Sequence, residues 1–284
     1  MGYELWISPN TGIRRKGTTF KELQSIFIDK ISTKYIYEPI LSCKLTDESQ
    51  YVKETLKMRE FDMVGVIDEN SQIIGFAKRK ELTKGLIENF TIKIEEQNLI
   101  PDSTPISELL NIFLNESFAF VVVEDKINGI VTRADINKPI VRIYLFGIIS
   151  LFEMHLNFWI NEFYKNEDWI EIIGDERLNE AKRIYELRKG KNVDLTLLEC
   201  LQLSDKKVIL KLTPEFLEYF EFSKSKLERL LKDIEKIRNG LAHSQSSIIS
   251  DLGWTDFVKT ISNAEMFLHG SEKIVEDKAR TPNT

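Results

Sequence analysis

The chain has 284 residues, 42% of them hydrophobic and 30% charged, so it is long enough for two modest domains with hydrophobic cores. Its formal net charge of -6 argues against a protein that binds nucleic acid over its whole surface, because such proteins usually carry a basic surplus. Cys43 and Cys200 lie far apart without CxxC spacing. They indicate neither a disulfide framework nor a zinc cluster, and they fit a reducing cytoplasm.

Residues 1–34 are expected to form a separate N-terminal segment. A short extended piece and two turns precede Thr19 and Glu22, which have capping-box spacing at the start of an amphipathic helix. The first residues do not read as a basic region followed by an apolar run, so they do not resemble a secretory signal.

Residues 35–138 are predicted to contain two copies of one unit. Each copy reads as a helix, a strand, a turn, a second strand and the start of another helix, and the pattern recurs after about 55 residues. In the first copy the strands are MVGVI and IIGFA, and KRKEL then opens a helix. In the second they are FAFVVV and GIV, and TRADI opens a helix. Two such units usually pack their sheets together.

The most specific element of the second copy is GIVTRAD, residues 129–135. Thr132 falls where the strand becomes a helix, so its hydroxyl and the first free N–H groups can meet an anion. Asp135, one turn later, can accept hydrogen bonds from two hydroxyl groups. Arg133 can neutralise a phosphate. The alternative is that Thr132 and Asp135 only form a capping box.

With these residues the tandem unit resembles a pair of CBS (cystathionine β-synthase) domains, which sense adenosine nucleotides, over roughly 104 residues. The resemblance implies that Asp135 binds ribose hydroxyls and Thr132 binds phosphate. In the first copy, lysine and glutamate stand where the second has this threonine and aspartate. We therefore expect one site per chain, on the second copy, for an adenine nucleotide as regulatory ligand. Lys78, Arg79 and Lys80 are expected to form a solvated face, with polyphosphate contact as the alternative.

Residues 139–270 are predicted to be helical, which gives an α+β chain: a CBS-pair α/β module followed by an all-α bundle. The most apolar run, IYLFGIISLF, has only ten residues. It is therefore expected to be a buried helix and not a membrane span. A last helix is expected from about Trp254 to Leu268, and the polar residues 271–284 are expected to form a flexible tail.

A line of polar residues marks the first of these helices. The line consists of Ser150, Glu153, Asn157 and Asn161, at spacings of three, four and four. Such spacings put the side chains on one face of an otherwise apolar helix. Because burying carboxylate and amide groups without partners is costly, we expect something polar to face this line.

The segment RNGLAH, residues 238–243, ends a long amphipathic helix. Asn239 and His243 share a helix face, whereas Arg238 lies about 140° away from His243. Gly240 can loosen the backbone, or a second subunit can supply its own copy, so that these side chains converge. Histidine can accept a proton near neutral pH and arginine can hold a phosphate, which are the needs of RNA cleavage through the 2′-hydroxyl. Alternatively, the cations favour the helix dipole and Gly240 ends the helix.

The spacing of Arg238 and His243 resembles the Arg-x4-to-6-His signature of HEPN domains, which are all-helical ribonucleases and nucleotide-binding modules. The resemblance implies a four- or five-helix bundle that dimerises, places two motifs in one cleft and cuts RNA without a metal or other cofactor. Arg238 would hold phosphate, Asn239 would orient the reacting groups, and His243 would act as general base or acid. Glu153, on the polar line, would face this site.

Together these patterns predict a cytoplasmic, homodimeric ribonuclease controlled by an adenine nucleotide, of a kind that suits a stress or phage-defence effector. Residues 1–34 and 224–243, each with six Lys/Arg against three Asp/Glu, could give local contact with an RNA substrate. One alternative is a non-catalytic module that dimerises or docks a toxin or antitoxin partner. In another, the nucleotide itself is the substrate, although no Walker-type glycine-rich loop supports it.

Overall fold

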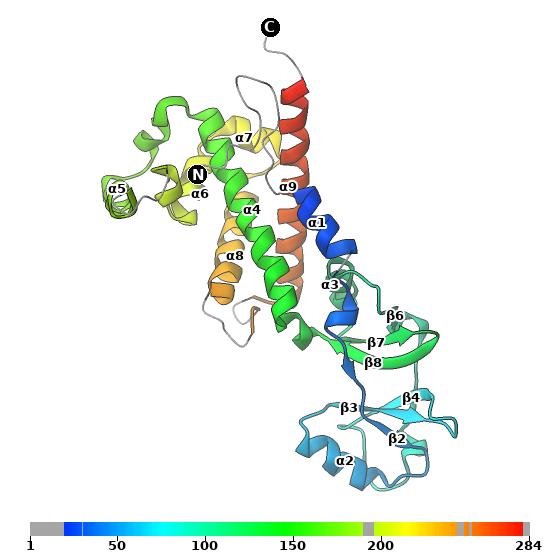
Figure 1. Ribbon diagram of the computed structural model, residues 1–284. Helices are drawn as coiled ribbons and strands as arrows, with labels where there is room; N and C mark the ends of the chain where they lie inside the picture. The colour runs from blue at the N-terminus through cyan, green and yellow to red at the C-terminus, as the bar shows by residue number, and fades with distance from the viewer. Residues whose placement is uncertain (1–19, 30, 190–195, 243–246, 250–251, 281–284) are drawn as a thin grey trace. The chain divides into compact units, whose positions relative to one another are not determined.

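The computed structural model describes residues 20–29, 31–189, 196–242, 247–249 and 252–280. The chain divides into two compact units, which are described separately (Figure 1). One comprises Phe27–Val141, and the other comprises Met1–Ile26 together with Arg142–Thr284.

Phe27–Val141 contains two four-stranded sheets with the strand orders β2-β3-β4-β5 and β1-β8-β7-β6. The first sheet is formed by β2 (Ser42–Lys44), β3 (Met63–Ile67), β4 (Ile73–Lys78) and β5 (Ile92–Lys93). The second is formed by β1 (Glu38–Pro39), β6 (Leu99–Pro101), β7 (Phe118–Val123) and β8 (Lys126–Thr132).

The two sheets are built in the same way. In the first, β2 runs parallel to β3 and is joined to it by helix α2 (Ser49–Met58), and β3 and β4 form an antiparallel hairpin. In the second, β6 runs parallel to β7 after helix α3 (Ile106–Asn115), and β7 and β8 form the hairpin. The duplication predicted from the sequence is therefore confirmed.

In each sheet the two-residue edge strand, β5 in the first and β1 in the second, passes close to a glycine of the hairpin. Gly75 pairs with Lys93 of β5, and Gly129 pairs with Pro39 of β1. A Cβ atom on Gly75 would lie 2.8 Å from the Ile92 carbonyl oxygen, and one on Gly129 would lie 2.3 Å from that of Glu38. Only glycine lets the backbones approach this closely. The glycine that opens GIVTRAD is thus required by the sheet.

Apolar side chains fill the space under each sheet. The core of the first copy consists of Cys43, Val52, Leu56, Val64, Val66, Ala77, Leu82 and Ile87. Between the copies, the rings of Phe76, Phe118 and Phe120 contact one another with centroids 5.4–5.5 Å apart. This aromatic contact joins the two sheets into one unit.

The chain after the second hairpin strand differs between the copies. Arg133–Asn137 forms a 3-10 helix after β8, whereas residues 79–81 after β4 form only a turn. The expectation that KRKEL opens a helix is therefore wrong. The physical reason is the cap: Thr132 and Asp135 satisfy the first N–H groups after β8, and the lysine and glutamate of the first copy form no such box.

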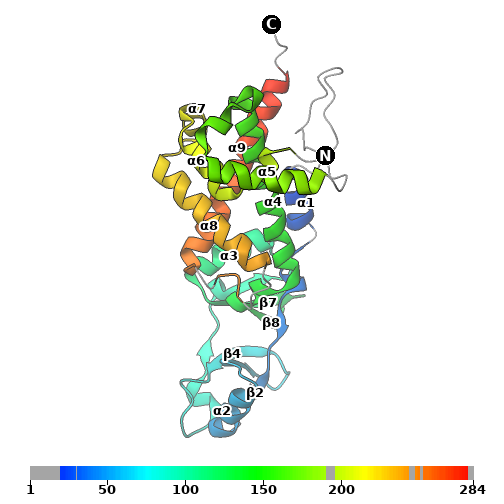
Figure 2. The same ribbon diagram turned by 90° about the vertical axis from the view of Figure 1, so that its left-hand side faces the viewer.

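The other unit is helical (Figure 2). Its α-helices are α1 (Phe20–Asp29), α4 (Pro139–Phe163), α5 (Asp175–Lys189), α6 (Leu203–Lys211), α7 (Pro214–Tyr219), α8 (Lys224–Ala242) and α9 (Trp254–Arg280). Short 3-10 helices at Lys165–Ile172 and Leu198–Cys200 connect them. The last residues of α1 and the first residues of α4 belong to Phe27–Val141, and the greater part of each helix belongs to this unit.

Helix α4 is the apolar centre of this unit. Phe152, Leu156, Trp159 and Ile160 are completely buried, and the ring of Phe152 packs against Phe267 of α9. By length and composition α4 could also cross a membrane, but 56% of its most apolar window is buried within the protein. That degree of burial is typical of a core helix, as expected from the shortness of the apolar run.

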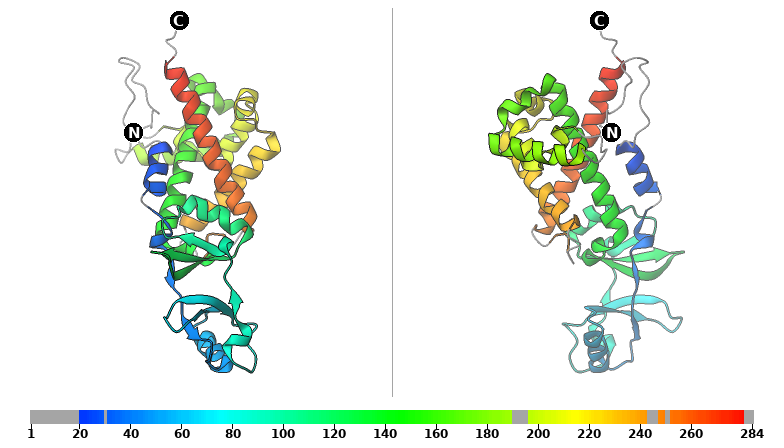
Figure 3. Two further views of the ribbon diagram at one scale, coloured as in Figure 1. Left: turned by 90° about the vertical axis from the view of Figure 1, so that its right-hand side faces the viewer. Right: turned by 60° about the vertical axis from the view of Figure 1, so that its left-hand side comes forward.

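Helix α9 extends further than the sequence suggested (Figure 3). It continues to Arg280, so the segment 271–284, expected to be a flexible tail, is helical up to that residue. Two polar contacts explain the extension. Ser271 is completely buried and lies 2.7 Å from His155 Nδ1, and the Glu272 carboxylate accepts a hydrogen bond from the backbone N–H of Phe20.

Candidate functional site

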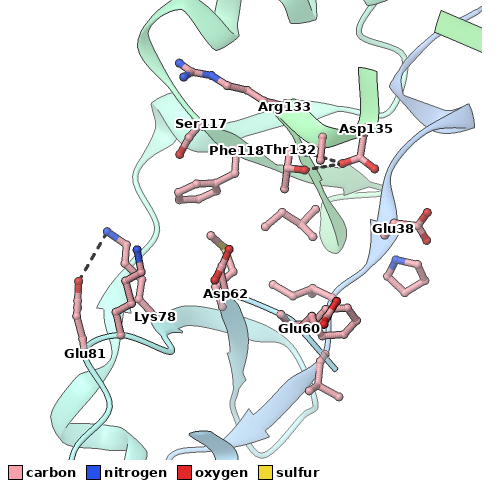
Figure 4. Close-up of a pocket in the computed structure, with 18 residues that line it drawn as sticks. Glu38, Glu60, Asp62, Lys78, Glu81, Ser117, Phe118, Thr132, Arg133 and Asp135 are labelled. Atoms are coloured by element: carbon pink, nitrogen blue, oxygen red, sulfur yellow. Dashed lines mark hydrogen bonds and ion pairs between the residues drawn. The ribbon is translucent and has the colours of Figure 1, made fainter. Parts of the chain in front are cut away.

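A cavity of about 850 Å³ lies between the two sheets of Phe27–Val141 (Figure 4). Both copies contribute to its wall. The lining residues are 38–41, 60–63, 78, 80, 81, 117, 118, 130 and 132–135. Small-molecule sites usually have volumes of roughly 300–1,000 Å³, so a ligand of nucleotide size fits this cavity.

Thr132 and Asp135 lie together on this wall (Figure 4). One carboxylate oxygen of Asp135 accepts hydrogen bonds from the backbone N–H of Thr132, at 2.7 Å, and from its hydroxyl, at 2.9 Å. The capping box weighed as an alternative is therefore present, and the same two side chains also face the cavity. The cap holds the carboxylate in one position at the cavity edge, so a ligand would meet a binding group that is already ordered.

Lys138 completes this corner, and the sequence interpretation did not include it. Its ammonium forms ion pairs with Asp135, at 3.0 Å, and with Glu38 of β1. Burial opposes the charge, but the hydrogen bonds to the two carboxylates outweigh it and raise the pKa of Lys138 above its ordinary value. Lys138 therefore remains a cation near neutral pH and reduces the negative charge of the site.

Arg133 borders the cavity but does not reach into it. Its guanidinium donates a hydrogen bond to the carbonyl oxygen of Phe113 in the last turns of α3, and in Figure 4 the side chain extends away from the cavity. Cations suit this end of a helix, whose carbonyl groups carry partial negative charge. The phosphate-binding role predicted for Arg133 is not supported by this placement.

The first copy supplies the cavity's lysines. Lys78 and Lys80 line it, with Glu81 3.9 Å from the Lys78 ammonium. Arg79 is instead 2.7 Å from Asp62 and is engaged there. This stretch was expected to be a solvated face. Both lysines do contact solvent, but each also borders the cavity. The cavity therefore combines carboxylates from both copies with two ammonium groups from the first.

In the helical unit, the structure brings Arg238 and Glu153 together. Arg238 Nη1 lies 3.2 Å from Glu153 Oε1, with the two side chains 34% and 24% exposed. An ion pair this accessible contributes only about 0–1 kcal/mol to stability. The expectation that Glu153 on the polar line faces Arg238 is met by this contact. Asn239 is exposed on the next position, and His243 lies outside the described residues.

A side chain of α4 forms hydrogen bonds with the C-terminal end of α8. The guanidinium of Arg142 donates hydrogen bonds to the carbonyl oxygens of Gly240, at 3.1 Å, and Leu241, at 3.3 Å. Gly240 is buried, and the helix continues past it to Ala242. Gly240 therefore does not end the helix, and Arg142, which the sequence interpretation did not include, takes the role of a cation at the helix C-terminus.

Two further buried polar residues lie in this unit. Lys206 of α6 is only 3% exposed, and burial lowers its pKa. His155 is 1% exposed, and burial lowers its pKa to about 3, so it is a neutral core residue. The spacing of Lys206 with respect to Leu203 and Leu210, three before and four after, would have indicated its burial.

Comparison with known proteins bears on one part of the chain. Residues 99–142 match the family model of the CBS domain. The chain contains a CBS domain. The matched residues include β6 to β8, α3 and the 3-10 helix that contains Asp135, so the CBS resemblance of the second copy is confirmed. The HEPN resemblance of the helical unit stays a prediction.

Several solved structures are similar to part of the chain. CBSX2, a protein of Arabidopsis thaliana, in complex with AMP has 18% sequence identity over 39% of this chain and 97% of its own, with a TM-score of 0.34. An uncharacterized conserved protein from Pyrococcus horikoshii has 20% identity over 37% and 88%, with a TM-score of 0.33. The CBS domain of a bacterial CNNM/CorC family Mg²⁺ transporter in complex with ATP has 18% identity over 41% and 91%, with a TM-score of 0.34. No curated protein matches the chain.

Proposed function

We propose that Phe27–Val141 is a sensor that binds an adenine nucleotide in the cavity between its sheets. The observation that carries the proposal is the position of Thr132 and Asp135, the polar residues of the CBS motif, fixed side by side on the wall of that cavity. A carboxylate has about four acceptor sites. Asp135 thus keeps acceptor capacity for ribose hydroxyls while it caps the 3-10 helix.

The phosphate end of the ligand is proposed to extend toward the first copy. The Thr132 hydroxyl donates to Asp135, so this hydroxyl is not available to donate to a phosphate while the cap is formed. Lys78 and Lys80 offer ammonium groups on the other side of the cavity. The ligand would therefore use both copies, with ribose on the second and phosphate on the first, in a single site.

Calorimetry with adenosine, AMP, ADP and ATP tests this proposal. AMP and ATP, the ligands named for the similar CBSX2 and CNNM/CorC structures, are the first compounds to measure. Asp135→Ala should weaken every ligand at least about tenfold, since a buried ribose hydroxyl loses its acceptor. Asp125→Ala, in the exposed β7–β8 turn, is the matched control. Equal affinities in wild type and Asp135→Ala would overturn the assignment.

The lysine contribution needs its own comparison. The double variant Lys78→Met/Lys80→Met should weaken ATP more than adenosine, because only ATP carries phosphate for the ammonium groups. Lys126→Met, an exposed lysine of the β7–β8 hairpin, is the control. Equal losses for adenosine and ATP would contradict the proposed direction of the ligand.

For the helical unit we propose a metal-independent ribonuclease of the HEPN type that the sensor controls. The contact between Arg238 and Glu153 supports it, because it places a guanidinium of the predicted motif at a partly exposed position that a phosphate can reach. Arg238 would hold phosphate, Asn239 would orient the scissile group, and His243 would transfer the proton. The proposed setting is a cytoplasmic homodimer acting in stress or phage defence.

The nuclease proposal is tested with purified full-length protein and RNA at neutral pH in EDTA, with and without nucleotide. Products ending in 2′,3′-cyclic phosphate should form, and Arg238→Ala and His243→Ala should abolish them. His269→Ala, on an exposed position of α9, is the control and should retain activity. RNA left intact by wild type under all nucleotide conditions would favour the alternative, a non-catalytic module that docks a partner.

A further inference from the structure

Lys206 is a cation placed where an apolar side chain is expected. It lies on the buried face of α6 with Leu203 and Ile209, and it is 3% exposed. Among the residues that the structure describes, its ammonium forms no hydrogen bond or ion pair. Because the side chain has so little access to water, its charge is unfavourable unless nearby charged groups balance it.

The charged groups that act on Lys206 come from four elements. They are Glu153 on α4, Arg238 on α8, Glu199 on the 3-10 helix Leu198–Cys200, and Asp205 next to it on α6. Burial lowers the pKa of Lys206 most strongly, Glu153 raises it and Arg238 lowers it further. Glu153 is thus the leading electrostatic partner of the ammonium, and Arg238 competes with it.

Neither of the other two carboxylates is equally available. Asp205 already caps α6, with a carboxylate oxygen 3.0 Å from the backbone N of Gln202, and it lies 3.6 Å from Arg177. Glu199 accepts hydrogen bonds from the backbone N–H and the hydroxyl of Thr196. Glu153, in contrast, uses one oxygen for Arg238, and its second oxygen accepts no hydrogen bond among the described residues.

We infer that Lys206 is a positioning residue that pairs with Glu153 when Arg238 turns to a phosphate group. The inference rests on the proposed ribonuclease function. While Glu153 holds Arg238, the carboxylate cancels much of the positive charge that phosphate binding needs. Releasing Arg238 would leave a partly buried carboxylate without a cation, which is unfavourable. Lys206 supplies the replacement cation, so that Glu153 exchanges one partner for another and Arg238 becomes free for the substrate.

The exchange is tested by binding of a single-stranded RNA oligonucleotide whose 2′-O-methyl riboses prevent cleavage, measured by fluorescence anisotropy. Lys206→Met should weaken binding about tenfold, a usual size for coupled charges in one network. Lys206→Arg should restore most of the affinity. Lys207→Met, the neighbouring and more exposed lysine of α6, is the matched control and should have little effect.

A double-mutant cycle distinguishes positioning from direct phosphate contact. In Glu153→Gln the carboxylate that Lys206 must hold is absent, so adding Lys206→Met should then cost less than twofold. A tenfold loss in both backgrounds would overturn the inference, because Lys206 would be acting independently of Glu153. If wild type does not bind the oligonucleotide, the ribonuclease proposal itself is overturned and this inference falls with it.

A spectroscopic measurement covers the case in which Lys206→Met does not fold. The pKa of Lys206, followed through the ¹³Cε chemical shift in selectively labelled protein, should rise when the oligonucleotide binds, since Arg238 leaves and Glu153 becomes its partner. The same titration in Glu153→Gln should show no rise. An unchanged pKa in wild type on saturation with oligonucleotide would overturn the exchange of partners.

Discussion

The two copies of the repeat reach the same sheet with different polar residues. Both have a glycine at the point where the fourth strand approaches, Gly75 and Gly129, and both have a parallel strand and a helix before the hairpin. After the hairpin, the second copy has the Thr132–Asp135 capping box and a 3-10 helix, and the first copy has a turn. The fold therefore requires the glycine at this position and the apolar residues of the strands, whereas the polar residues after the hairpin can differ between the copies.

A second difference lies at the lysine that ends each motif. Lys138 and Lys84 stand 54 positions apart, as Gly129 and Gly75 do. Lys138 pairs with Asp135 and Glu38, whereas Lys84 is exposed. The charged corner thus exists only in the copy that carries the threonine and the aspartate, which supports a ligand-binding role for that corner.

Substitution of the shared glycines should have the largest effect. Gly129→Ala should lower the free energy of unfolding by about 3 kcal/mol, because the new methyl group meets a backbone carbonyl at 2.3 Å. Gly75→Ala should cost somewhat less, since its nearest backbone atom would be 2.8 Å away. Urea denaturation measures both. Gly270→Ala, where nothing lies within 4 Å, is the control; a similarly small effect at Gly129 would contradict the close approach of β1.

Substitutions in the polar motifs of the two copies should have the next largest effect on stability. Asp135→Ala should cost about 2 kcal/mol, since it removes the cap of the 3-10 helix and one partner of Lys138. Glu81→Ala in the first copy should cost less than about 0.5 kcal/mol, because the 3.9 Å contact to Lys78 is exposed. Thermal unfolding compares the two variants. Equal costs would mean that the turn of the first copy is held as firmly as the capped helix.

Alkaline pH should separate the two lysines. The pKa of Lys138 is raised in the folded protein, so its pairing stabilises fully below the ordinary lysine pKa of 10.5 and is lost as the pH rises above it. Lys138→Met should therefore remove about 1 kcal/mol at pH 9, after allowance for solvent screening, and progressively less as the pH rises through the raised pKa of the folded protein. Denaturation midpoints across this range measure the effect, with Lys84→Met at the matching exposed position as the control.

Transferring the cap should have the smallest effect. Lys78→Thr/Glu81→Asp gives the first copy the threonine and aspartate of the second, and it should stabilise the protein by about 0.5 kcal/mol by capping the segment after β4. Lys78→Thr/Glu81→Ala, which lacks the partner carboxylate, is the matched control. A destabilised double variant with no gain over this control would show that the turn at residues 79–81 excludes the 3-10 geometry.

Much of the fold of Phe27–Val141 could be predicted from the sequence, because apolar strands with turns between them recur at a fixed spacing. The strands β1 and β5 could not, since two residues each are too few for a periodic pattern. The helix expected at KRKEL failed because propensity cannot replace a missing cap. The end of α9 was misjudged because a buried Ser271 reads in the sequence like any polar residue of a tail.

The candidate sites were predictable to a similar degree. Thr132 and Asp135 followed from the motif, and the position of Glu153 opposite Arg238 was implied by the HEPN resemblance. The structure brings each pair together. Lys138 was missed because no sequence pattern separates a paired lysine from a solvated one, and Lys206 was missed although its spacing to Leu203 and Leu210 indicated burial. The role assigned to Arg133 depended on the direction of one long side chain, which sequence spacing does not determine.

Strand β1 comes before the first copy in the chain but completes the sheet of the second. The stretch that matches the CBS family, residues 99–142, therefore lacks one strand of its own sheet. Expressed alone, it would expose the edge of β8, and open edges pair with strands from other molecules. Dissection of this protein into halves should then yield aggregates or strand-exchanged oligomers.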